Sequence, residues 1–502
     1  MGIINDPDDI KNRITDPFTD YHGKINIEYR GASSLKFDKK SYSLETQDEN
    51  GENLNVALMG MPEENDWVLY APYSDKSLLR NVLTYHLARK MGQYASRTQF
   101  CELILNAEYR GIYVFMEKIK CDKNRIDISK LRKKEVAGDD VTGGYIIKID
   151  EDNGPERGWE SKVFPLYQNY QPIFFQYHYP EYDEIMPEQQ AYIQNFVQEF
   201  ETVLVDSHFS NPETGYTNYV NLQSFIDHFI INEFAKNIDA FRRSVYLYKD
   251  KNSVDGRLVA GPVWDFNLAY GNFEGEESDA YSPEGWMFNQ GGNRMFWWVR
   301  MMQDELFKIH LRLRWQELRR DILKIASLFQ YIDEMRELVQ EAQERNFTRW
   351  PILGQKVWPN HFVGDTYQEE VDYLKQWIYE RISWMDKNMA AIQLPDDFDE
   401  DHENENDNKN LQTFTLEIYP NPFINNTTIK YELAKPSHVN VQIYNVLGQA
   451  VKTLLNTVQH ANEQHISWDG TDKFGNIVPG GLYICVLKID WEIRSVQKFI
   501  KM

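Results

Sequence analysis

Two polar side chains that could bind a metal ion follow an apolar run near the middle of the chain. Residues 258–263 lead into Trp264, and then Asp265 and Asn267 stand two positions apart. Side chains at positions i and i+2 of a strand point to the same face, so a strand here would place both oxygens beside one hard cation. The alternative for this segment alone is a turn held by Asx hydrogen bonds.

A second polar cluster, residues 232–244, follows an apolar helical run and contains Asp239. A lone Asp at a helix end is more often a cap or an ion-pair partner than a catalytic group. However, Asp239 and Asp265 lie 26 positions apart, with a predicted β-hairpin between them. This order is typical of kinase-like phosphotransferases, in which one Asp orients the substrate hydroxyl and a second holds Mg²⁺ against the nucleotide phosphates.

A small-residue turn at residues 29–34 precedes two lysines, Lys39 and Lys40. Backbone N–H groups in such a turn can approach an anion, and the lysines can add positive charge for a phosphate. The segment has no GxGxxG or Walker pattern, so the motif alone favours an ordinary hairpin turn with solvated lysines.

The elements that must position these groups fall into a β-rich half, residues 1–150, and an α-rich half, residues 151–395. In the first half one helix is predicted at residues 77–91, where apolar side chains recur at helical spacing before Gly92. A cleft between two such lobes is a usual place for a ligand. The predicted strands are 25–29, 41–45, 102–105, 111–117, 144–149, 245–249 and 258–263, and the later predicted helices are 187–205, 222–238, 296–325, 329–345 and 366–392.

The last part of the chain begins with an acidic stretch. Residues 396–410 contain eight acidic side chains and one Lys, so we expect a flexible linker over 396–412. A calcium-binding loop is the alternative, but the DxDxDG spacing is missing. Residues 413–502 carry short β-like runs separated by Pro, Gly and Asn, which predicts a small all-β sandwich. These runs are 416–419, 427–433, 439–444, 465–468, 481–488 and 496–500.

Length, composition and charge exclude several classes of protein. With 502 residues, 42% of them hydrophobic, the chain is long enough for about three domains and is not globally disordered. No apolar run is long enough to span a membrane. The formal charge of −23 argues against a nucleic-acid binder, which needs a basic face. The N-terminus has no charged-then-apolar signal segment, which alone indicates a cytoplasmic protein.

The three cysteines, Cys101, Cys121 and Cys485, match no zinc-binding pattern. Cys101 and Cys121 flank a predicted hairpin. Its turn near residues 106–110 would pair Cys101 with a residue near 114, so a disulfide to Cys121 is not expected.

Residues ~20–390 resemble the CotH kinase family, named for spore coat protein H. The resemblance implies a secreted protein kinase with an α+β, atypical protein-kinase-like two-lobed fold that uses ATP with Mg²⁺ or Mn²⁺. The matching blocks are IEYRGASS (27–34), KKSYSLE (39–45), DWVLYAPYSDKSLLRNVLTYHLARKMG (66–92), LILNAEYRGIYVFMEKIK (103–120), GGYIIKID (143–150), NEFAKNIDAFRRSVYLYKD (232–250) and GPVWDFNLAYGN (261–272).

The resemblance also implies roles by position. Asp239 would be the catalytic-loop aspartate and Asp265 the metal-binding aspartate. Lys40 is the first candidate for the phosphate-contacting lysine, and Lys118, which follows Glu117 on the nucleotide side, is the second. The implied phosphate-side turn consists of Arg30, Ser33 and Ser34.

Two positions depart from the family pattern. The family often has a second Asp where this chain has Asn267, and some members have an Asn where it has Ser244. The implied metal ligands are then Asp265, Asn267 and Ser244, with less negative charge than usual. The departures leave open weaker metal binding, a different metal preference or a non-catalytic pseudokinase.

The C-terminal part has a resemblance of its own. Residues 419–433, 441–454 and 466–488, with the closing VQKFIKM, resemble a type IX secretion sorting domain of the immunoglobulin-like type. The resemblance implies handling by the type IX secretion machinery and an extracellular or cell-surface location, so the absent signal peptide is then interpreted as a truncation. Asp469 and Asp472, in a WDGxD turn, are expected to be turn residues rather than metal ligands.

The main hypothesis is an exported kinase that transfers the ATP γ-phosphate to Ser or Thr hydroxyls of a protein substrate. One alternative is a non-catalytic surface module that binds polysaccharide through some of the thirteen tryptophans, although Trp286, Trp297 and Trp298 are expected to be core residues. Another is a glycoside hydrolase with paired carboxylates, which the family resemblance disfavours.

Overall fold

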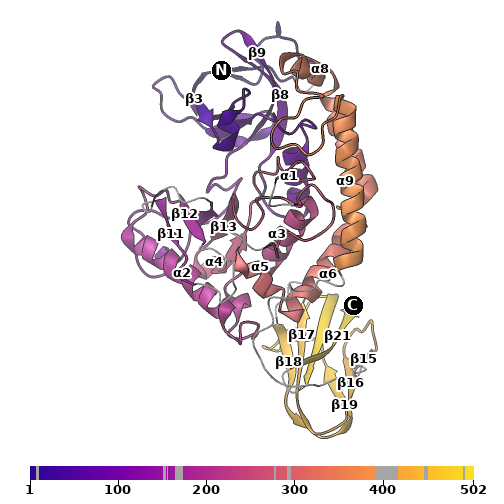
Figure 1. The fold of residues 1–502 in the computed structure, drawn as a ribbon. Coiled ribbons are helices and arrows are strands. Elements are labelled where there is room, and N and C mark those ends of the chain that lie inside the picture. The colour runs from indigo at the N-terminus through magenta and orange to yellow at the C-terminus, as the bar shows by residue number, and fades with distance from the viewer. Residues whose placement is uncertain are drawn as a thin grey trace. The chain divides into compact units, whose positions relative to one another are not determined.

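The computed structural model divides the chain into two compact units, and Figure 1 shows its ribbon. Unit 1 comprises Met1–Asp206, Tyr219–Trp298 and Trp315–Ile392, and unit 2 comprises Ser207–Asn218, Val299–Arg314 and Gln393–Met502. The described residues are 1–6, 11–150, 154, 157–163, 173–275, 279–290, 295–389, 416–445, 450–489 and 492–502. The predicted linker, residues 396–412, lies outside them.

The first sheet of unit 1 is antiparallel, with the strand order β3-β4-β7-β9-β8. Its strands are β3 (Lys24–Arg30), β4 (Ser41–Gln47), β7 (Asp66–Tyr70), β9 (Glu108–Glu117) and β8 (Thr98–Leu105). The turn of the β8-β9 hairpin has positive φ at both Asn106 and Ala107, as a two-residue hairpin turn of type I′ requires. The hairpin pairs Cys101 with Tyr113, which confirms the predicted register, and the three cysteines are free thiols.

The second sheet of unit 1 is also antiparallel, with the order β11-β12-β10-β13-β14. Its strands are β11 (Gly158–Glu160), β12 (Phe174–Tyr179), β10 (Tyr145–Ile149), β13 (Val245–Lys249) and β14 (Leu258–Ala260). The central strand β10 is paired on both edges, and Ile147 lies opposite Leu247 of β13. From the sequence, this strand is predicted as part of the β-rich half, residues 1–150. It lies instead at the centre of the second sheet, where Ile146 and Ile147 are both buried.

Four helices of unit 1 fall within their predicted ranges: α1 (Arg80–Lys90), α2 (Pro187–Val205), α3 (Leu222–Ala235) and α9 (Tyr367–Asn388). Helix α3 ends at Ala235 because Lys236 adopts a left-handed conformation with φ of 44°. The N–H of Lys236 donates to the C=O groups of Asn232 and Glu233, which satisfies carbonyls that the helix end would leave open. This end directs the chain toward Asp239.

Two predicted helices are each divided. Helices α5 (Phe296–Met301) and α6 (Glu305–Arg320) replace the predicted 296–325, and α7 (Ile325–Leu338) and α8 (Gln340–Arg349) replace 329–345. The first break is at Asp304, whose carboxylate accepts the N–H of Leu306 at 3.0 Å and so caps the start of α6. The shorter elements are β1 (Gly2–Ile3), β2 (Tyr21–His22), η1 (Ser33–Lys36), β5 (Val56–Leu58), β6 (Met61–Glu64), η2 (Asp140–Thr142), η4 (Tyr216–Asn218) and α4 (Asn252–Asp255).

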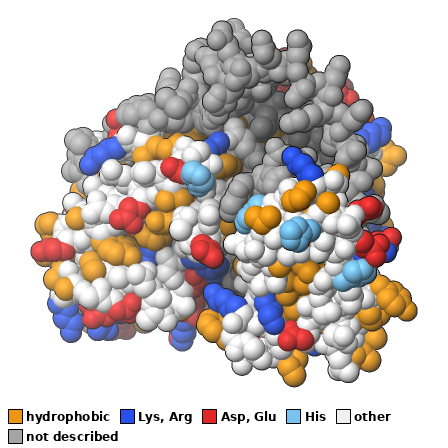
Figure 2. All heavy atoms as spheres, turned by 90° about the horizontal axis from the view of Figure 1, so that it is seen from below, with side chains coloured by type: hydrophobic (Ala, Val, Ile, Leu, Met, Phe, Trp, Pro, Cys, Tyr) orange, Lys and Arg blue, Asp and Glu red, His pale blue; other side chains and the backbone are white. Residues whose placement is uncertain are grey.

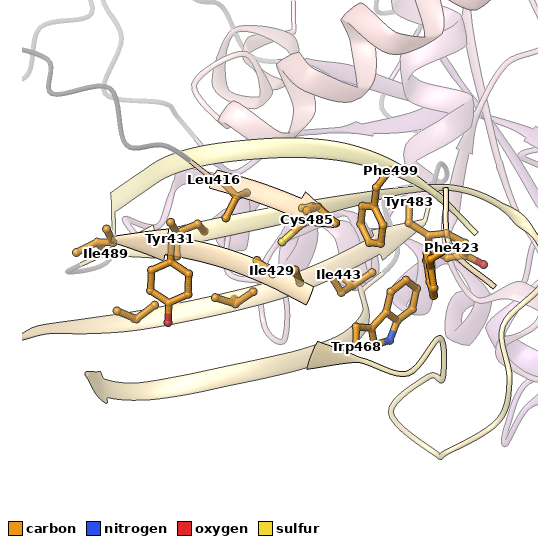
Figure 3. Packing of buried hydrophobic residues seen from close by; sticks show 14 of the residues in the cluster. Leu416, Phe423, Ile429, Tyr431, Ile443, Trp468, Tyr483, Cys485, Ile489 and Phe499 are labelled. Carbon is orange, nitrogen blue, oxygen red and sulfur yellow. The ribbon is translucent and has the colours of Figure 1, made fainter. Parts of the chain in front are cut away.

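The C-terminal strands of unit 2 form two sheets, β15-β16-β19 and β18-β17-β20-β21, which confirms the predicted all-β region. Figure 3 shows their shared core, in which Trp468, Phe423 and Phe499 pack near Cys485. Strand β18 was not predicted, because its side chains are exposed or half-buried and show no apolar alternation. The strands are β15 (Leu416–Tyr419), β16 (Thr427–Leu433), β17 (Ser437–Asn445), β18 (Ala450–Gln459), β19 (Asn462–Trp468), β20 (Gly481–Ile489) and β21 (Glu492–Lys501).

The four-stranded sheet is apolar on both faces. A second buried cluster joins side chains of β17 and β20 to the first half of α6, a segment of unit 2 that lies far earlier in the chain. The buried members of this cluster are Leu306, Tyr444, Ile484 and Val486.

The two aspartates of the WDGxD segment hydrogen-bond within their own turn. Asp469 Oδ1 accepts the N–H of Thr471 at 3.1 Å, and Asp472 Oδ1 accepts the N–H groups of Phe474 and Asn476 at 2.9 Å each. These are Asx-type contacts, so the expectation that both are turn residues is confirmed.

On the surface shown in Figure 2, acidic and basic side chains of the described residues are interspersed with hydrophobic ones. They form no continuous basic area on that face, which is what a nucleic-acid backbone would require. Among the helices described, none is both long enough and apolar enough to cross a membrane.

Candidate functional site

Asp265 lies in an irregular segment after β14, and side chains of α1 hold its backbone. The strand ends at Ala260, and Asp265 has a left-handed φ of 65°. The strand geometry expected to align Asp265 with Asn267 is therefore wrong, because the segment is not extended there. The Tyr85 hydroxyl accepts the N–H of Asp265 at 3.1 Å, and Asn81 Oδ1 accepts the next N–H, of Phe266, at 2.7 Å.

Asp239 lies in the turn between α3 and β13. Its C=O accepts the N–H groups of Arg242 and Arg243 at 3.2 and 3.0 Å, and its carboxylate pairs with Arg242 Nη2 at 3.2 Å. Burial raises the pKa of Asp239 above its ordinary value, and the two arginines offset this only in part. The Asp239 side chain keeps 16% of its surface exposed, so a ligand can reach it.

Asp239 and Asp265 interact electrostatically, together with Asp150, which follows β10. The pKa of Asp265 is raised to about 6, mainly by burial and also by the charges of Asp239 and Asp150, while Lys148 and Arg30 oppose the rise. The structure therefore brings together the two aspartates that sequence spacing had paired. Carboxyl groups whose pKa is shifted by burial and by like charges are common at functional sites.

Two cations from different sheets approach these carboxylates. Lys148 of β10 forms an ion pair with Asp150, and its Nζ lies 5.7 Å from the ring centroid of Tyr246. Burial works against the charged form of Lys148, but Tyr246, Asp150 and Asp265 outweigh it and raise its pKa. The guanidinium of Arg30, at the end of β3, lies 5.3 Å from the Trp264 ring centroid.

Aromatic side chains frame the cluster. Trp264 stacks on Tyr85 at 6.1 Å and meets Tyr246 edge-on at 6.3 Å. His178 of β12 also meets Tyr246 edge-on, at 5.1 Å. Burial, reinforced by Lys148, Lys118 and Arg30, lowers the pKa of His178 to about 4 although its hydrogen bond with the Ile119 carbonyl opposes this. His178 is therefore neutral near pH 7.

The predicted phosphate-side turn is only partly joined to this cluster. Lys40 donates its ammonium protons to the carbonyl of Leu35, at 2.7 Å, and to that of Phe37. Gly31 has a φ of 115°, and a Cβ there would lie 1.9 Å from Ser34 Oγ, so the turn needs glycine. Among the described contacts, none joins Lys40 or Ser34 to the two aspartates, whereas Arg30 does approach Asp265. The Ser33 side chain lies outside the described residues.

Glu117 and Lys118 belong to ion pairs of the first sheet. Glu117 is fully buried and accepts hydrogen bonds from Arg97 Nη1 at 2.7 Å and the Tyr94 hydroxyl at 3.2 Å. Lys118 pairs with Asp66 at 3.2 Å and keeps 32% of its side chain exposed. Glu117 is thus committed to internal partners, whereas Lys118 is accessible to a ligand.

The other two predicted metal ligands lie in turns. Ser244 precedes β13 with a φ of 52°, and Asn267 accepts a hydrogen bond from Asn272 through its backbone carbonyl at 2.8 Å. In the described part of the chain, no group of three or more His, Cys, Asp and Glu side chains is placed to hold a metal ion. Mg²⁺ in phosphotransferases needs only one or two protein carboxylates, because phosphates and waters supply the remaining oxygens. Asp265 could supply one such carboxylate to Mg²⁺ or Mn²⁺ held together with a nucleotide.

Lys148 and Asp150 were not predicted as site residues. Their signal in the sequence is the run Tyr145-Ile146-Ile147-Lys148-Ile149-Asp150, in which a lone Lys interrupts an apolar strand. A charged residue inside a buried strand needs a partner, and Asp150 and Asp265 supply the negative charge.

Two family profiles match the chain. The profile described as CotH kinase protein matches residues 27–385, and the one described as secretion system C-terminal sorting domain matches residues 417–502. No curated protein matches. Dimeric latent PorU from Porphyromonas gingivalis is 23% identical over 17% of this chain and 9% of its own, with a TM-score of 0.16. The Pseudomonas fluorescens alkylpurine DNA glycosylase AlkC bound to DNA containing an abasic site analog is 12% identical over 42% and 55%, with a TM-score of 0.14. At these TM-scores neither structure informs the fold.

Proposed function

Because the chain belongs to the CotH kinase protein family over residues 27–385 and ends in a secretion sorting domain over 417–502, we propose that it is an exported, metal-dependent protein kinase. These matches confirm membership of the two families that the sequence resembles. The proposed reaction transfers the γ-phosphate of ATP to a Ser or Thr hydroxyl of a protein substrate, on a two-lobed kinase-like fold. The proposal depends most on the electrostatic interaction of Asp265 with Asp239 and with the cations Lys148 and Arg30.

In this proposal each charged side chain has one task. Asp239 orients the acceptor hydroxyl and accepts its proton, and Asp265 is the main ligand of a divalent ion. When bound, that ion neutralises charge on the nucleotide phosphates. Lys148 and Arg30 add fixed positive charge on the same side. Catalysis is then mainly positioning and charge neutralisation.

The test is phosphate transfer from ATP to the chain itself or to a casein-like acceptor in Mg²⁺ or Mn²⁺. Asp239→Ala and Asp265→Ala should each reduce transfer by about 100-fold or more. Asp333→Ala is the control, because Asp333 lies on α7 and pairs with Lys375, outside the cluster. Transfer that is unchanged in both site variants would contradict the residue assignment.

The sorting domain implies a secreted or cell-surface protein that the type IX secretion machinery handles. We propose that export precedes the kinase reaction, so that the acceptors are themselves secreted or surface proteins. Deleting residues 416–502 should retain the chain in the cell, and fractionation would show it. Unchanged secretion of the truncated chain would contradict this step.

A non-catalytic pseudokinase is the second candidate. The observation in its favour is that Asn267 and Ser244 are neutral, and that the described residues include no group of three or more His, Cys, Asp and Glu side chains placed to hold a metal ion. Sugar stacking by Trp297 and Trp298 is not part of this candidate, because both are fully buried, as expected. Trp286, which was also expected in the core, is half-buried. A thermal shift with ATP and Mn²⁺ favours the kinase, and the absence of both the shift and transfer favours the pseudokinase.

A further inference from the structure

Helix α1 is almost entirely buried, yet one of its faces is polar. Eight of its eleven residues are buried. Four side chains of one face, Arg80, Asn81, Thr84 and Tyr85, bond to residues 265–270. A polar face inside a core is costly unless its hydrogen bonds are satisfied. Here they are satisfied by the segment that carries Asp265.

The four contacts fall into two pairs. Arg80 Nε donates to the Ala269 carbonyl at 3.0 Å, and the Thr84 hydroxyl bonds to that of Tyr270 at 2.8 Å. These two contacts fasten the far end of the segment. The other pair, from Tyr85 and Asn81, accepts the consecutive N–H groups of Asp265 and Phe266.

The backbone at Asp265 needs such support. A φ of 65° is uncommon for a residue with a Cβ and persists where the surroundings fix it. The Asp265 N–H and the Phe266 N–H flank the Cα that carries the carboxylate, so fixing both of them fixes the direction of that side chain. Rotation of either peptide would change the direction of the Asp265 carboxylate.

The base of the helix is itself immobilised. Asp75 Oδ1 accepts from Arg80 Nη1 at 2.6 Å, and Asp75 Oδ2 accepts the Arg80 N–H at 2.9 Å. At the other end of the segment, Asn272 Nδ2 donates to the Ser74 carbonyl at 3.2 Å. The acceptors on α1 are therefore held in place before any ligand arrives, which is the condition for a preorganised site.

We infer that Tyr85 and Asn81 are positioning residues, which hold Asp265 in its left-handed conformation and thereby direct its carboxylate toward the ligand side shared with Asp239. The inference deepens the proposed function and rests on it for the identity of the ligand. If Tyr85 and Asn81 had only a structural role, their loss would have the same effect as the loss of Arg80 or Thr84, which bind the same segment. It would have no additional effect at Asp265.

The experiment uses the full chain with Tyr85→Phe and Asn81→Leu. Tyr85→Phe keeps the ring that stacks on Trp264 and removes only the acceptor hydroxyl. Thr84→Val is the matched control, because it removes a buried hydroxyl of the same helix that bonds to Tyr270. The measurements are melting temperature, hydrogen exchange of the Asp265 and Phe266 amides, and the Mn²⁺ concentration for half-maximal phosphate transfer.

We expect faster exchange at these two amides in Tyr85→Phe and Asn81→Leu. We also expect about a 10- to 100-fold loss of kcat/KM for ATP with a raised Mn²⁺ requirement. Thr84→Val should leave the Mn²⁺ requirement unchanged. The inference is overturned if Thr84→Val changes amide exchange and the Mn²⁺ requirement as much as the other two variants do. It is also overturned if Tyr85→Phe changes neither of them. If the wild-type chain transfers no phosphate, the proposed function fails, and the exchange of the two amides alone decides the positioning role.

Discussion

Arg381 of α9 and Glu233 of α3 form a salt bridge at 3.2 Å in which neither side chain is exposed. Glu233 also accepts the N–H of Phe288 at 2.7 Å, and Arg381 donates to the Gly285 carbonyl at 2.6 Å. Burial raises the pKa of Glu233, and Arg381 lowers it again only in part. The pair thus ties residues 285–288 to the helix that leads into Asp239.

Replacing Arg381 with Met should destabilise unit 1 strongly, because Glu233 would remain buried without its cation. We expect a loss of about 3–5 kcal/mol in the free energy of unfolding, measured by urea denaturation. Arg319→Met is the control, since Arg319 pairs with Asp386, whose side chain is 44% exposed. It should cost about 1 kcal/mol or less. Equal losses of unfolding free energy in the two variants would show that the buried pair stabilises the chain no more than the exposed pair does.

Asp265→Asn should stabilise the chain above pH 6. The pKa of Asp265 is about 6 in the folded chain and ordinarily 3.8. Between these values the folded state binds more protons than the unfolded state, so the free energy of unfolding falls as pH rises, and it levels off above about 6. The neutral amide avoids this cost. We expect a gain of about 1–2 kcal/mol at pH 7.5, allowing for partial exposure, and a smaller gain at pH 4.5.

Thermal denaturation at the two pH values measures this difference. The control is Asp333→Asn, because the Asp333 side chain is 45% exposed and pays little desolvation. A gain at Asp265 that does not depend on pH would mean that the carboxylate is not destabilised in the folded chain. If Asp265→Asn stabilises the chain but abolishes phosphate transfer, Asp265 is kept for function and not for stability.

Local patterns were sufficient for most of the elements. The bounds of α2 match the prediction, because its apolar residues keep helical spacing and Pro187 stands at its first position. The break before α6 could not be predicted in this way. Asp304 also accepts the Tyr216 hydroxyl at 2.9 Å, from 88 positions earlier, and a partner so distant in the chain leaves no local pattern.

The candidate site was predictable in part for the same reason. The spacing of Asp239 and Asp265 reflects a connected helix, turn and hairpin, so the sequence places both near one another. Lys148 was missed because its nearness to them depends on β10 pairing with β13, where it lies opposite Tyr246. Lys40 is the first candidate from the sequence because of its place on the strand before the helix, but its ammonium donates to the carbonyls of Leu35 and Phe37.

Leu306→Ala should destabilise unit 2, although residue 306 lies more than 100 positions before the C-terminal strands. Leu306 is 8% exposed and packs with Ile484 and Val486 of β20. Removing its buried methyl groups should cost about 2–4 kcal/mol, seen as faster hydrogen exchange of the β20 amides. Leu338→Ala, at a 62% exposed position, should change stability by about 0.5 kcal/mol or less. Unchanged exchange in β20 would show that α6 is not part of this core.

Lys148, rather than Lys40, should be the lysine on which phosphate transfer depends. Lys148 stabilises negative charge at the site, because it lowers the pKa of Asp265 and pairs with Asp150. Lys40 instead donates its protons to the carbonyls of Leu35 and Phe37. We expect Lys148→Met to reduce kcat/KM for ATP by about 100-fold or more and Lys40→Met by less than about 10-fold. Steady-state kinetics with both variants, after their melting temperatures are compared, measure this difference. The reverse order of losses would restore Lys40 as the phosphate-contacting residue and would require its turn to open when ATP binds.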